Sequence, residues 1–345
     1  MKTVESVTEG HPDKVCDQIA DAILDAYLAR DPSSRVAVEV FGSHGALMIG
    51  GEVTSSEEID PALIAKKVYR DIGYDDDIEV FTNIEEQSPD IARGVDTGGA
   101  GDQGIMYGYA TAETPEFLPK PVVLAQKLAW GLTNLRKNHP EFSWLRPDGK
   151  TQVTMAGNFI TAAVVSAQHR HDMPVEEIRR LLLKHLLEPT LGDLSKSAVH
   201  INPTGLFVSG GFQADTGLTG RKIMVDTYGG LIPHGGGAFS GKDPTKVDRS
   251  GAYMCRFAAK NIVANGLAKN CLVSVAYAIG KEAPVMLSAR SGDGLDLTQY
   301  LKQHFDFRPR AIIERLSLRR PLYRATAAYG HFGRDEFPWE HIALT

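Results

Sequence analysis

Cysteine is scarce in this sequence, and long apolar runs are absent. The 345 residues include three cysteines, Cys16, Cys255 and Cys271, which are far apart and form no CxxC pair. We therefore expect no disulfide framework and a reducing, cytoplasmic location. No uncharged apolar stretch approaches the roughly 18 residues that a membrane span needs. Residues 1–5 lack the apolar core of a signal peptide, so a membrane or secreted protein is not expected.

An excess of positive charge is also missing. Lys and Arg total 37 against 43 Asp and Glu, which gives a net charge of −6. An acidic chain is a poor general binder of nucleic acid or of a membrane surface, so we expect neither as a partner. It can still hold an anion where its cations are concentrated. Apolar residues make up 43% and charged residues 23%, values that exclude a disordered or fibrous chain.

A helix, two strands and a second helix recur three times along the chain. Apolar periodicity predicts helices over residues 12–30, 61–72, 121–137, 174–187, 248–264 and 297–305, with strands over 35–54, 152–166 and 271–289 between successive pairs. In the first helix, aspartates recur every fourth residue from Asp13 to Asp25, on the side opposite the apolar stripe. Chance recurrence of a common motif is the alternative explanation for the threefold pattern.

The repeat predicts an α+β fold of three similar α/β-layer domains with internal pseudo-symmetry. We place the domains at residues 1–90, 100–209 and 210–345. Exchange of chain segments between the structural units is left open.

Two glycine-rich stretches interrupt this pattern. Residues 87–104 are polar and glycine-rich, and they indicate a long loop of the kind that often serves as a lid. Residues 235–242 contain the string GxxxxGK, after a strand predicted at 223–225. A phosphate loop needs Ser or Thr next, but Asp243 and a proline follow, so we reject that motif.

Positive charge nevertheless gathers around this second stretch. Lys242, Lys246 and Arg249 could bind an anion that the glycines allow to approach. Asp243 and Asp248 could hold a divalent metal on phosphate oxygens. The alternative is a glycine-rich turn capped by aspartate, with solvated lysines.

The string EGHPDK at residues 9–14 places chemically able side chains at the predicted start of the first helix. Free amides and the helix dipole favour an anion there. Asp13 could simply complement the dipole, whereas His11 between Gly and Pro is harder to explain as a core residue. A carboxylate beside a phosphate is repulsive unless Mg²⁺ bridges them, so metal-bound polyphosphate is the economical joint interpretation.

Other candidates are weaker when taken singly. Arg221 and Lys222 could grip phosphate, or they could be a solvated surface pair. Residues 146–150, RPDGK, have a turn signature that also carries a cation. Glu39 and Glu52 interrupt apolar strands and could face solvent. If buried, each needs a partner such as a ligand amino group or a monovalent ion.

Together these motifs resemble the methionine adenosyltransferase family over nearly the whole chain. Five strings in order carry the resemblance, at residues 9–14, 99–104, 220–223, 235–244 and 327–333. The family implies three α+β domains around a pseudo-threefold axis and a homodimer with interfacial active sites, often paired into a tetramer. The implied substrates are ATP and L-methionine, and the implied cofactors are Mg²⁺ and K⁺. Sulfur would attack C5′ of ATP, and the leaving tripolyphosphate would be cleaved to phosphate and diphosphate.

The resemblance also implies roles for individual residues. The implied catalytic residues are His11, Lys150, Arg221 and Lys242. The implied ATP-binding residues are His11, Asp148, Lys150, Phe207, Asp215, Arg221, Lys222, Ala238 and Lys242. The implied methionine-binding residues are Glu52, Gln87, Asp102, Asp215, Lys246 and Ile279. Asp13 and Asp248 would bind Mg²⁺, and Glu39 would bind K⁺.

Three features depart from the family pattern. The loop between Val95 and Gly101 is several residues shorter than is usual in bacterial members, so its gating cannot be carried over. Leu206 stands before Phe207 where many members have Arg. The N-terminus and several connections are short, which bears on tetramer contacts.

Two other functions remain open. An ATP-dependent phosphotransferase would release ADP. A catalytically inactive nucleotide-binding regulatory subunit would bind ATP without forming a sulfonium product.

Overall fold

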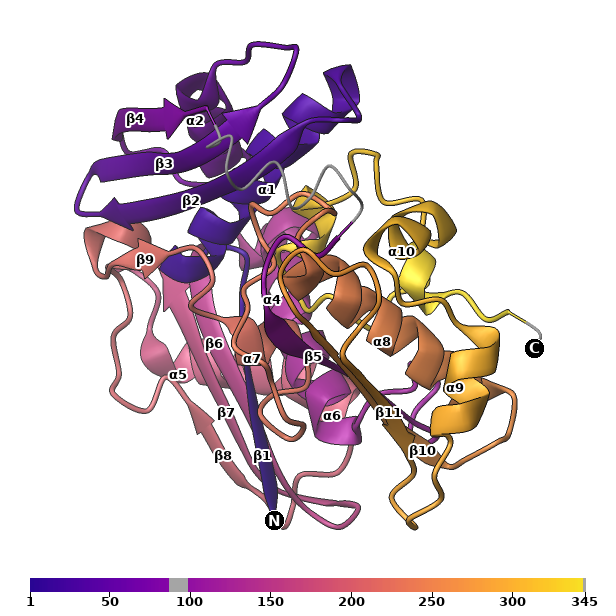
Figure 1. The fold of residues 1–345 in the computed structure, drawn as a ribbon. Helices are drawn as coiled ribbons and strands as arrows, with labels where there is room; N and C mark the ends of the chain where they lie inside the picture. The colour runs from indigo at the N-terminus through magenta and orange to yellow at the C-terminus, as the bar shows by residue number, and fades with distance from the viewer. Residues whose placement is uncertain (87–98, 344–345) are drawn as a thin grey trace.

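Three β-sheets with helices packed between them make up the fold (Figure 1). The computed structural model describes residues 1–86 and 99–343. Each sheet is built on an antiparallel hairpin: β2 (Arg35–Ser43) with β3 (Ala46–Thr54), β6 (Leu145–Ala156) with β7 (Phe159–His169), and β10 (Asn270–Tyr277) with β11 (Met286–Arg290). All three hairpins were predicted from the sequence.

The first strand of every hairpin also pairs with a strand from a distant part of the chain. These antiparallel partners are β9 (Gly217–Leu218) for β2, β1 (Lys2–Val7) for β6, and β5 (Gly104–Thr111) for β10. Each sheet therefore combines segments that are far apart in sequence. The threefold recurrence of one arrangement confirms the predicted α+β fold of three similar units.

A long helix precedes each hairpin and packs on its first strand. These helices are α1 (Pro12–Arg30) on β2, α4 (Lys120–Asn138) on β6, and α8 (Val247–Ala264) on β10. The helices that follow the hairpins are α2 (Pro61–Ile72), α5 (Val175–Leu182) and α9 (Thr298–His304). Two of them lead to a parallel strand: β4 (Glu79–Glu85) beside β3, and β8 (Ala198–Ile201) beside β7.

Shorter elements complete the chain. A π-helical turn at Leu183–Leu187 and α6 (Glu188–Leu191) extend α5, and α10 (Pro309–Arg315) follows α9. Turns of 3₁₀ helix lie at Pro140–Phe142, Gly211–Gln213, Arg324–Thr326 and Pro338–Glu340. Among the described residues, no helix is both long enough and apolar enough to cross a membrane.

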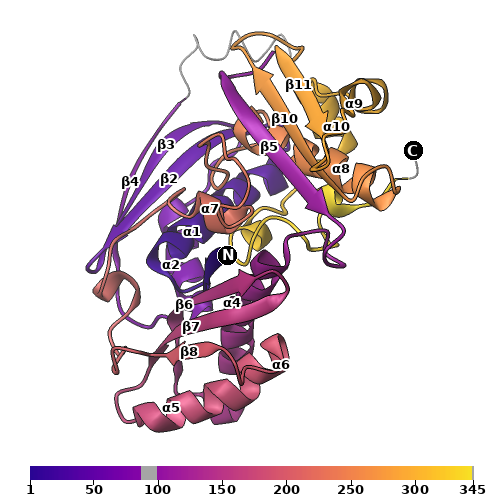
Figure 2. The same ribbon diagram turned by 90° about the horizontal axis from the view of Figure 1, so that it is seen from below.

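Helices α1 and α8 lie at the centre of the molecule, and nearly all of their residues are buried. Figure 2 shows the three sheets arranged around this centre. Val36, Val38 and Val40 turn one face of β2 inward and are almost fully buried. Because α1 is buried on all sides, its polar side chains must find their hydrogen-bond partners inside the protein.

Two local predictions were wrong. The strand expected at 223–225 is a helical turn, α7 (Ile223–Asp226), although its β-branched residues favour a strand. Residues 146–150 are not a turn but the start of β6. The pairing of β6 with β7 is irregular between Leu145 and Gly149, so Pro147 lies where no regular ladder bond is lost.

The predicted loop at 87–104 lies largely outside the described residues. Its described end, 99–103, has no helix or strand, and β5 begins at Gly104.

Candidate active site

A first cluster of predicted site residues forms at the start of α1. His11 is the N-cap of the helix, and its Nδ1 accepts a hydrogen bond from the backbone N–H of Asp13 at 3.2 Å. The Asp13 carboxylate accepts from Nζ of Lys222 at 2.5 Å and from the backbone N–H of Leu218 at 3.0 Å. Nε of Arg221 lies 3.6 Å from the same carboxylate. The fold therefore joins the 9–14 and 220–223 strings in one place.

The side chain of His11 is uncharged near neutral pH. Burial, together with the charges of Lys222 and Lys150, lowers the pKa of His11 to about 3, although Asp215 acts in the opposite direction. Because Nδ1 accepts a hydrogen bond, the neutral ring carries its hydrogen on Nε2. His11 can thus donate one hydrogen bond to a ligand oxygen. The electrostatic effects also place Lys150 and Asp215 near the ring.

Asp148 is buried beside this cluster with one oxygen unsatisfied. Its Oδ2 accepts from the backbone N–H of Gly211 at 3.0 Å, whereas Oδ1 has no hydrogen-bond partner among the described residues. Burial raises the pKa of Asp148 to about 6. An unpartnered buried oxygen is costly unless a ligand or water donor meets it, so Oδ1 can still accept a hydrogen bond.

Phe207 and Ala238, two residues predicted to contact the nucleotide, are each fixed by a neighbouring part of the chain. Phe207 is half-buried, and its N–H donates to Nε2 of His169 at 3.1 Å, whereas Leu206 is 67% exposed. A side chain added at Gly220 would place its Cβ 2.6 Å from that of Ala238, so Ala238 packs against the strand-to-loop segment before Arg221.

A second cluster forms where the glycine-rich segment docks on β2. Nζ of Lys242 lies 2.6 Å from Oδ2 of Asp248, and Lys246 pairs with Asp243. Asp243 accepts from the backbone N–H of Thr245 at 2.8 Å, as in the alternative of an aspartate-capped turn. The lysines, however, are ion-paired rather than freely solvated.

The glycines of this segment allow close approach to protein backbone. Gly241 has a φ of 80°, and a Cβ there would lie 1.9 Å from the carbonyl oxygen of Val38. Its own carbonyl accepts from the N–H of Val38 at 3.0 Å. Lys242 is therefore fixed against β2. It lies near Asp21 in the middle of α1, whereas the first cluster lies at the start of that helix.

Two predicted carboxylates lie on the outer face of the β2–β3 hairpin. Glu39 is exposed and pairs in register with Gly50, and Glu52 is half-buried and pairs with Ala37. Within residues 1–86 and 99–343, neither carboxylate makes a hydrogen bond or ion pair. Both face away from α1, so one chain alone does not bring them to the first cluster.

An exposed apolar row runs across the same outer face. Phe41, Met48 and Phe81 are register partners on β2, β3 and β4, and they are 46%, 42% and 49% exposed. Three large apolar side chains side by side on a sheet face are typical of an interaction surface.

The remaining predicted methionine contacts that the structure describes are exposed in the single chain, and one of them, Asp215, lies close enough to His11 to affect its pKa. Asp102 is exposed and accepts from the backbone N–H of Gln103, and Asp215 is exposed and accepts from that of Thr216. Ile279 is 61% exposed just after β10. Gln87, and most of the loop between Val95 and Gly101, lie outside the described residues.

The carboxylates predicted to bind metal fit a metal shared with substrate better than a protein cage. No group of three or more His, Cys, Asp or Glu side chains in the described part of the chain could hold a metal. Asp13 and Asp248 instead each pair with one lysine. Mg²⁺ is commonly bound by one or two carboxylates together with substrate phosphates, and these residues fit that pattern.

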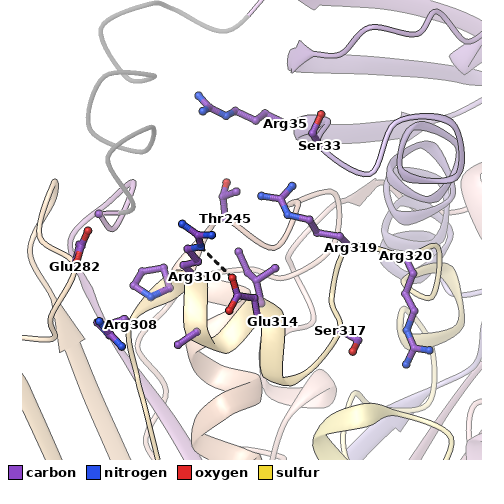
Figure 3. A pocket seen from close by; sticks show the side chains of 14 residues that line it. Ser33, Arg35, Thr245, Glu282, Arg308, Arg310, Glu314, Ser317, Arg319 and Arg320 are labelled. Atoms are coloured by element: carbon purple, nitrogen blue, oxygen red, sulfur yellow. Dashed lines mark hydrogen bonds and ion pairs between the residues drawn. The ribbon is translucent and has the colours of Figure 1, made fainter.

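A cavity of about 1150 Å³ lies near α10 and is lined by arginines and by Thr245, whose N–H donates to Asp243 of the second cluster (Figure 3). None of the predicted site residues lines it. Arg308 pairs with Asp306, Arg310 pairs with Glu314 at 3.0 Å, and Arg319 donates to a backbone carbonyl. These contacts serve the local structure.

Sequence reasoning missed a buried charge network beneath the first cluster. Nζ of Lys14 donates to Asp17 at 2.9 Å and to Asp226. Asp17 in turn accepts from the backbone N–H of Gly220 at 2.8 Å. The signal in the sequence was the four-residue repeat of aspartates in the first helix.

Comparison with known proteins agrees with these motifs. Models for the N-terminal, central and C-terminal domains of S-adenosylmethionine synthetase match residues 1–89, 97–207 and 209–341. The chain is 52% identical to a Sorangium cellulosum protein named S-adenosylmethionine synthase, over 98% of this chain and 86% of that protein. Proteins of the same name from Desulforudis audaxviator and Thermus thermophilus are 52% and 49% identical, each over 99% of this chain and 95% of the relative.

The alignment with the Sorangium protein spans 368 positions, more than the 345 residues of this chain, so the relative carries segments that this chain lacks. Three consecutive domain models and about 50% identity over nearly the full length leave one assignment. The chain belongs to the S-adenosylmethionine synthetase family.

Proposed function

We propose that this chain synthesises S-adenosyl-L-methionine from ATP and L-methionine. The methionine sulfur attacks C5′ of ATP, and the tripolyphosphate released is then hydrolysed to phosphate and diphosphate. The observation that carries the proposal is the neutral His11, which caps α1 and carries its hydrogen on Nε2, with Arg221 and Lys222 paired to the neighbouring Asp13 carboxylate. The names of the relatives point to the same product.

The chemistry explains why the site offers charge rather than a nucleophile. A thioether sulfur is a modest neutral nucleophile, and the leaving group carries several negative charges. Positioning of the two substrates and electrostatic stabilisation of the leaving group must therefore lower the barrier. His11 donates to the oxygen that departs from C5′, and Lys150, Arg221 and Lys222 bind the phosphates.

Other residues around the first cluster hold the nucleoside. The unpartnered Oδ1 of Asp148 accepts a hydrogen bond from a nucleotide hydroxyl or amino group. Phe207 and Ala238 pack against the nucleotide, and Asp215 orients substrate near His11. Leu206 is exposed, so the nucleotide contact at this position is made by the backbone and by Phe207.

The carboxylates paired with lysine are the positions for metal. Asp13 and Asp248 would hold Mg²⁺ at the phosphates, and Glu39 would hold K⁺. Bound Mg²⁺ supplies neutralisation of the triphosphate charge. In that arrangement Lys222 and Lys242, which neutralise the two carboxylates here, are free to bind phosphate oxygens.

A second copy of the chain completes the site. Glu39 and Glu52 lie on the outer face of the hairpin with the exposed row of Phe41, Met48 and Phe81. Covering this face with a second copy buries the apolar row and brings the second cluster to a partner's first cluster. The methionine is then held by Glu52, Gln87, Asp102, Asp215, Lys246 and Ile279. Pairing of dimers into a tetramer, and a cytoplasmic location, stay predictions of the sequence.

Product analysis tests the function directly. The protein is incubated with ATP, methionine, Mg²⁺ and K⁺, and products are followed by mass spectrometry. We expect S-adenosylmethionine, phosphate and diphosphate without ADP. ATP binding without a sulfonium product would support an inactive regulatory subunit instead, and ADP would indicate a phosphotransferase.

A further inference from the structure

Helix α1 carries four aspartates one turn apart, and each holds an incoming segment of the chain by its backbone. We call Asp13, Asp17, Asp21 and Asp25 the aspartate ladder. The donors are the backbone N–H groups of Leu218 for Asp13, Gly220 for Asp17, Gly241 for Asp21, and Tyr323 and Arg324 for Asp25, at 2.8–3.0 Å. Four carboxylates on one helix face thus fix three segments that are distant in sequence.

The backbone held by two members of the ladder leads directly into the proposed site. Gly220, held by Asp17, immediately precedes Arg221 and Lys222, and Gly241, held by Asp21, immediately precedes Lys242. Asp17 and Asp21 lie about 6 Å apart along the helix axis. The residues that Asp25 holds carry no proposed role in the site.

Asp17 and Asp21 differ in what else depends on them. Asp21 is the bidentate partner of the buried Arg249, at 2.7 and 2.8 Å, so its loss would leave a buried guanidinium unpaired. Asp17 shares its cation: Lys14 donates both to Asp17 and to Asp226. Lys14 therefore keeps a carboxylate partner when Asp17 is replaced.

The geometry at Gly220 leaves its segment little freedom. Gly220 has a φ of 81°, and Ala238 lies against it closely enough to exclude a side chain. Its N–H points to Oδ1 of Asp17, which is fully buried. The residues before Gly220 are held by the pairing of β9 with β2 and by the bond from Leu218 to Asp13, whereas the Gly220 N–H itself is held by one charge-assisted hydrogen bond, to Asp17.

We propose that Asp17 is a positioning residue for the reaction, and that its bond to the Gly220 N–H aims Arg221 and Lys222 at the phosphates. The proposal rests on the proposed function of the site. Asp17 touches neither substrate, so it acts through Gly220. A small displacement of two phosphate-binding cations weakens the stabilisation of a multiply charged leaving group more than it weakens the fold.

The test compares Asp17→Asn with Asp25→Asn. An asparagine at 17 has one acceptor, which the Lys14 ammonium takes by its stronger charge-assisted bond, so the amide NH₂ faces the Gly220 N–H and that bond is lost. An asparagine at 25 likewise loses one of the two hydrogen bonds that Asp25 accepts from the backbone N–H groups of Tyr323 and Arg324. The two variants therefore lose matched bonds on the same helix, and they differ in which segment is released.

We expect Asp17→Asn to lower kcat roughly 10- to 100-fold. The thermal unfolding midpoint should fall no further than in Asp25→Asn, whose kcat should stay within about twofold. Hydrogen exchange followed by mass spectrometry should show faster exchange of residues 217–222 in Asp17→Asn alone. An unchanged kcat in Asp17→Asn, or an equal loss in Asp25→Asn, overturns the proposal.

A measurement on the unsubstituted protein keeps the proposal testable even where Asp17→Asn does not fold. The Gly220 amide should exchange slowly without any ligand, because Asp17 holds it before substrate arrives. Rapid exchange of that amide overturns the proposal. Absence of S-adenosylmethionine synthesis by the unsubstituted protein is a separate result, since it contradicts the proposed function and not the Asp17–Gly220 bond.

Discussion

At the scale of the residue, His11 shows how burial selects chemistry. Its ring is 2% exposed and surrounded by lysines, and its pKa is lowered to about 3. A group that stays neutral cannot act as a strong acid near pH 7, so its contribution is a fixed hydrogen bond. Such a donor is worth most where water is excluded and charge develops.

Replacement of His11 by alanine should therefore lower kcat on the order of 100- to 1000-fold, by analogy with a lost oxyanion donor worth about 2.7–4 kcal/mol. Because the pKa of His11 is lowered to about 3 in the free protein, the unsubstituted enzyme should show no step in kcat/KM that belongs to His11 between pH 5.5 and 8.5. Steady-state kinetics of both proteins across this range measure both effects. An inflection near pH 6.5 that disappears in His11→Ala would contradict the assignment.

Asp25 gives a prediction about stability rather than activity. Burial raises the pKa of Asp25 to about 6, although two backbone N–H groups and Arg249 act in the opposite direction and Asp21 reinforces the rise. The folded protein consequently holds this proton more tightly than the unfolded chain. The contribution of Asp25 to the free energy of unfolding must fall as pH rises from about 4 to about 6.

Asparagine at position 25 cannot ionise, so Asp25→Asn should gain stability relative to the unsubstituted protein as pH rises through this interval. Urea unfolding of the two proteins at pH 4.5 and pH 7 gives the difference at each pH. The sign of the prediction is wrong if the free energy of unfolding of Asp25→Asn, relative to that of the unsubstituted protein, is lower at pH 7 than at pH 4.5.

At the scale of the element, local patterns predicted most helices and hairpins, whereas long-range partners decided the exceptions. Helix α1 has the predicted bounds because its apolar spacing and the prolines at 12 and 32 are local signals. Residues 223–226 form a helical turn whose Asp226 pairs with the buried Lys14, a partner 212 residues away. No window of sequence contains that contact.

The candidate site divides in the same way. His11, Asp13, Arg221 and Lys222 could be found because they stand in short strings with recognisable chemistry. The aspartate ladder was visible as a repeat, but its role could not be read, because burial of a carboxylate depends on which distant backbone reaches it. The exchange of β1, β5 and β9 between units was likewise invisible to local pattern.

The glycine-rich segment offers a test of close approach with a matched control. Gly241 and Gly230 have nearly the same φ, 80° and 78°. A Cβ at Gly241 would collide with the carbonyl oxygen of Val38, whereas a Cβ at Gly230 would meet nothing within 4 Å. Alanine at either position incurs the cost of a positive φ, on the order of 1–2 kcal/mol.

Gly241→Ala must in addition move the segment that carries Lys242. We expect it to destabilise the fold further than Gly230→Ala and to lower kcat at least tenfold, in line with displacement of a positioned group. Chemical denaturation and steady-state kinetics separate the two effects. Equal losses in both variants would mean that backbone conformation, and not docking on β2, governs this segment.

At the scale of the whole molecule, the outer face of the β2–β3–β4 sheet determines whether one chain can work alone. This face holds the apolar row of Phe41, Met48 and Phe81 together with Glu39 and Glu52. Activity that depends on these carboxylates should therefore depend on protein concentration, because dilution separates the two copies.

Phe41→Asp places a charge in the middle of that face and should weaken self-association at least tenfold, since a buried unpaired carboxylate is costly. Phe159→Asp is the control, because Phe159 is 78% exposed at the β6–β7 turn and lies on another sheet. Sedimentation velocity should show Phe41→Asp as a monomer with little activity, and Phe159→Asp as an active dimer. A fully active monomer of Phe41→Asp would mean that one chain holds the complete site, and that Glu39 and Glu52 have no part in it.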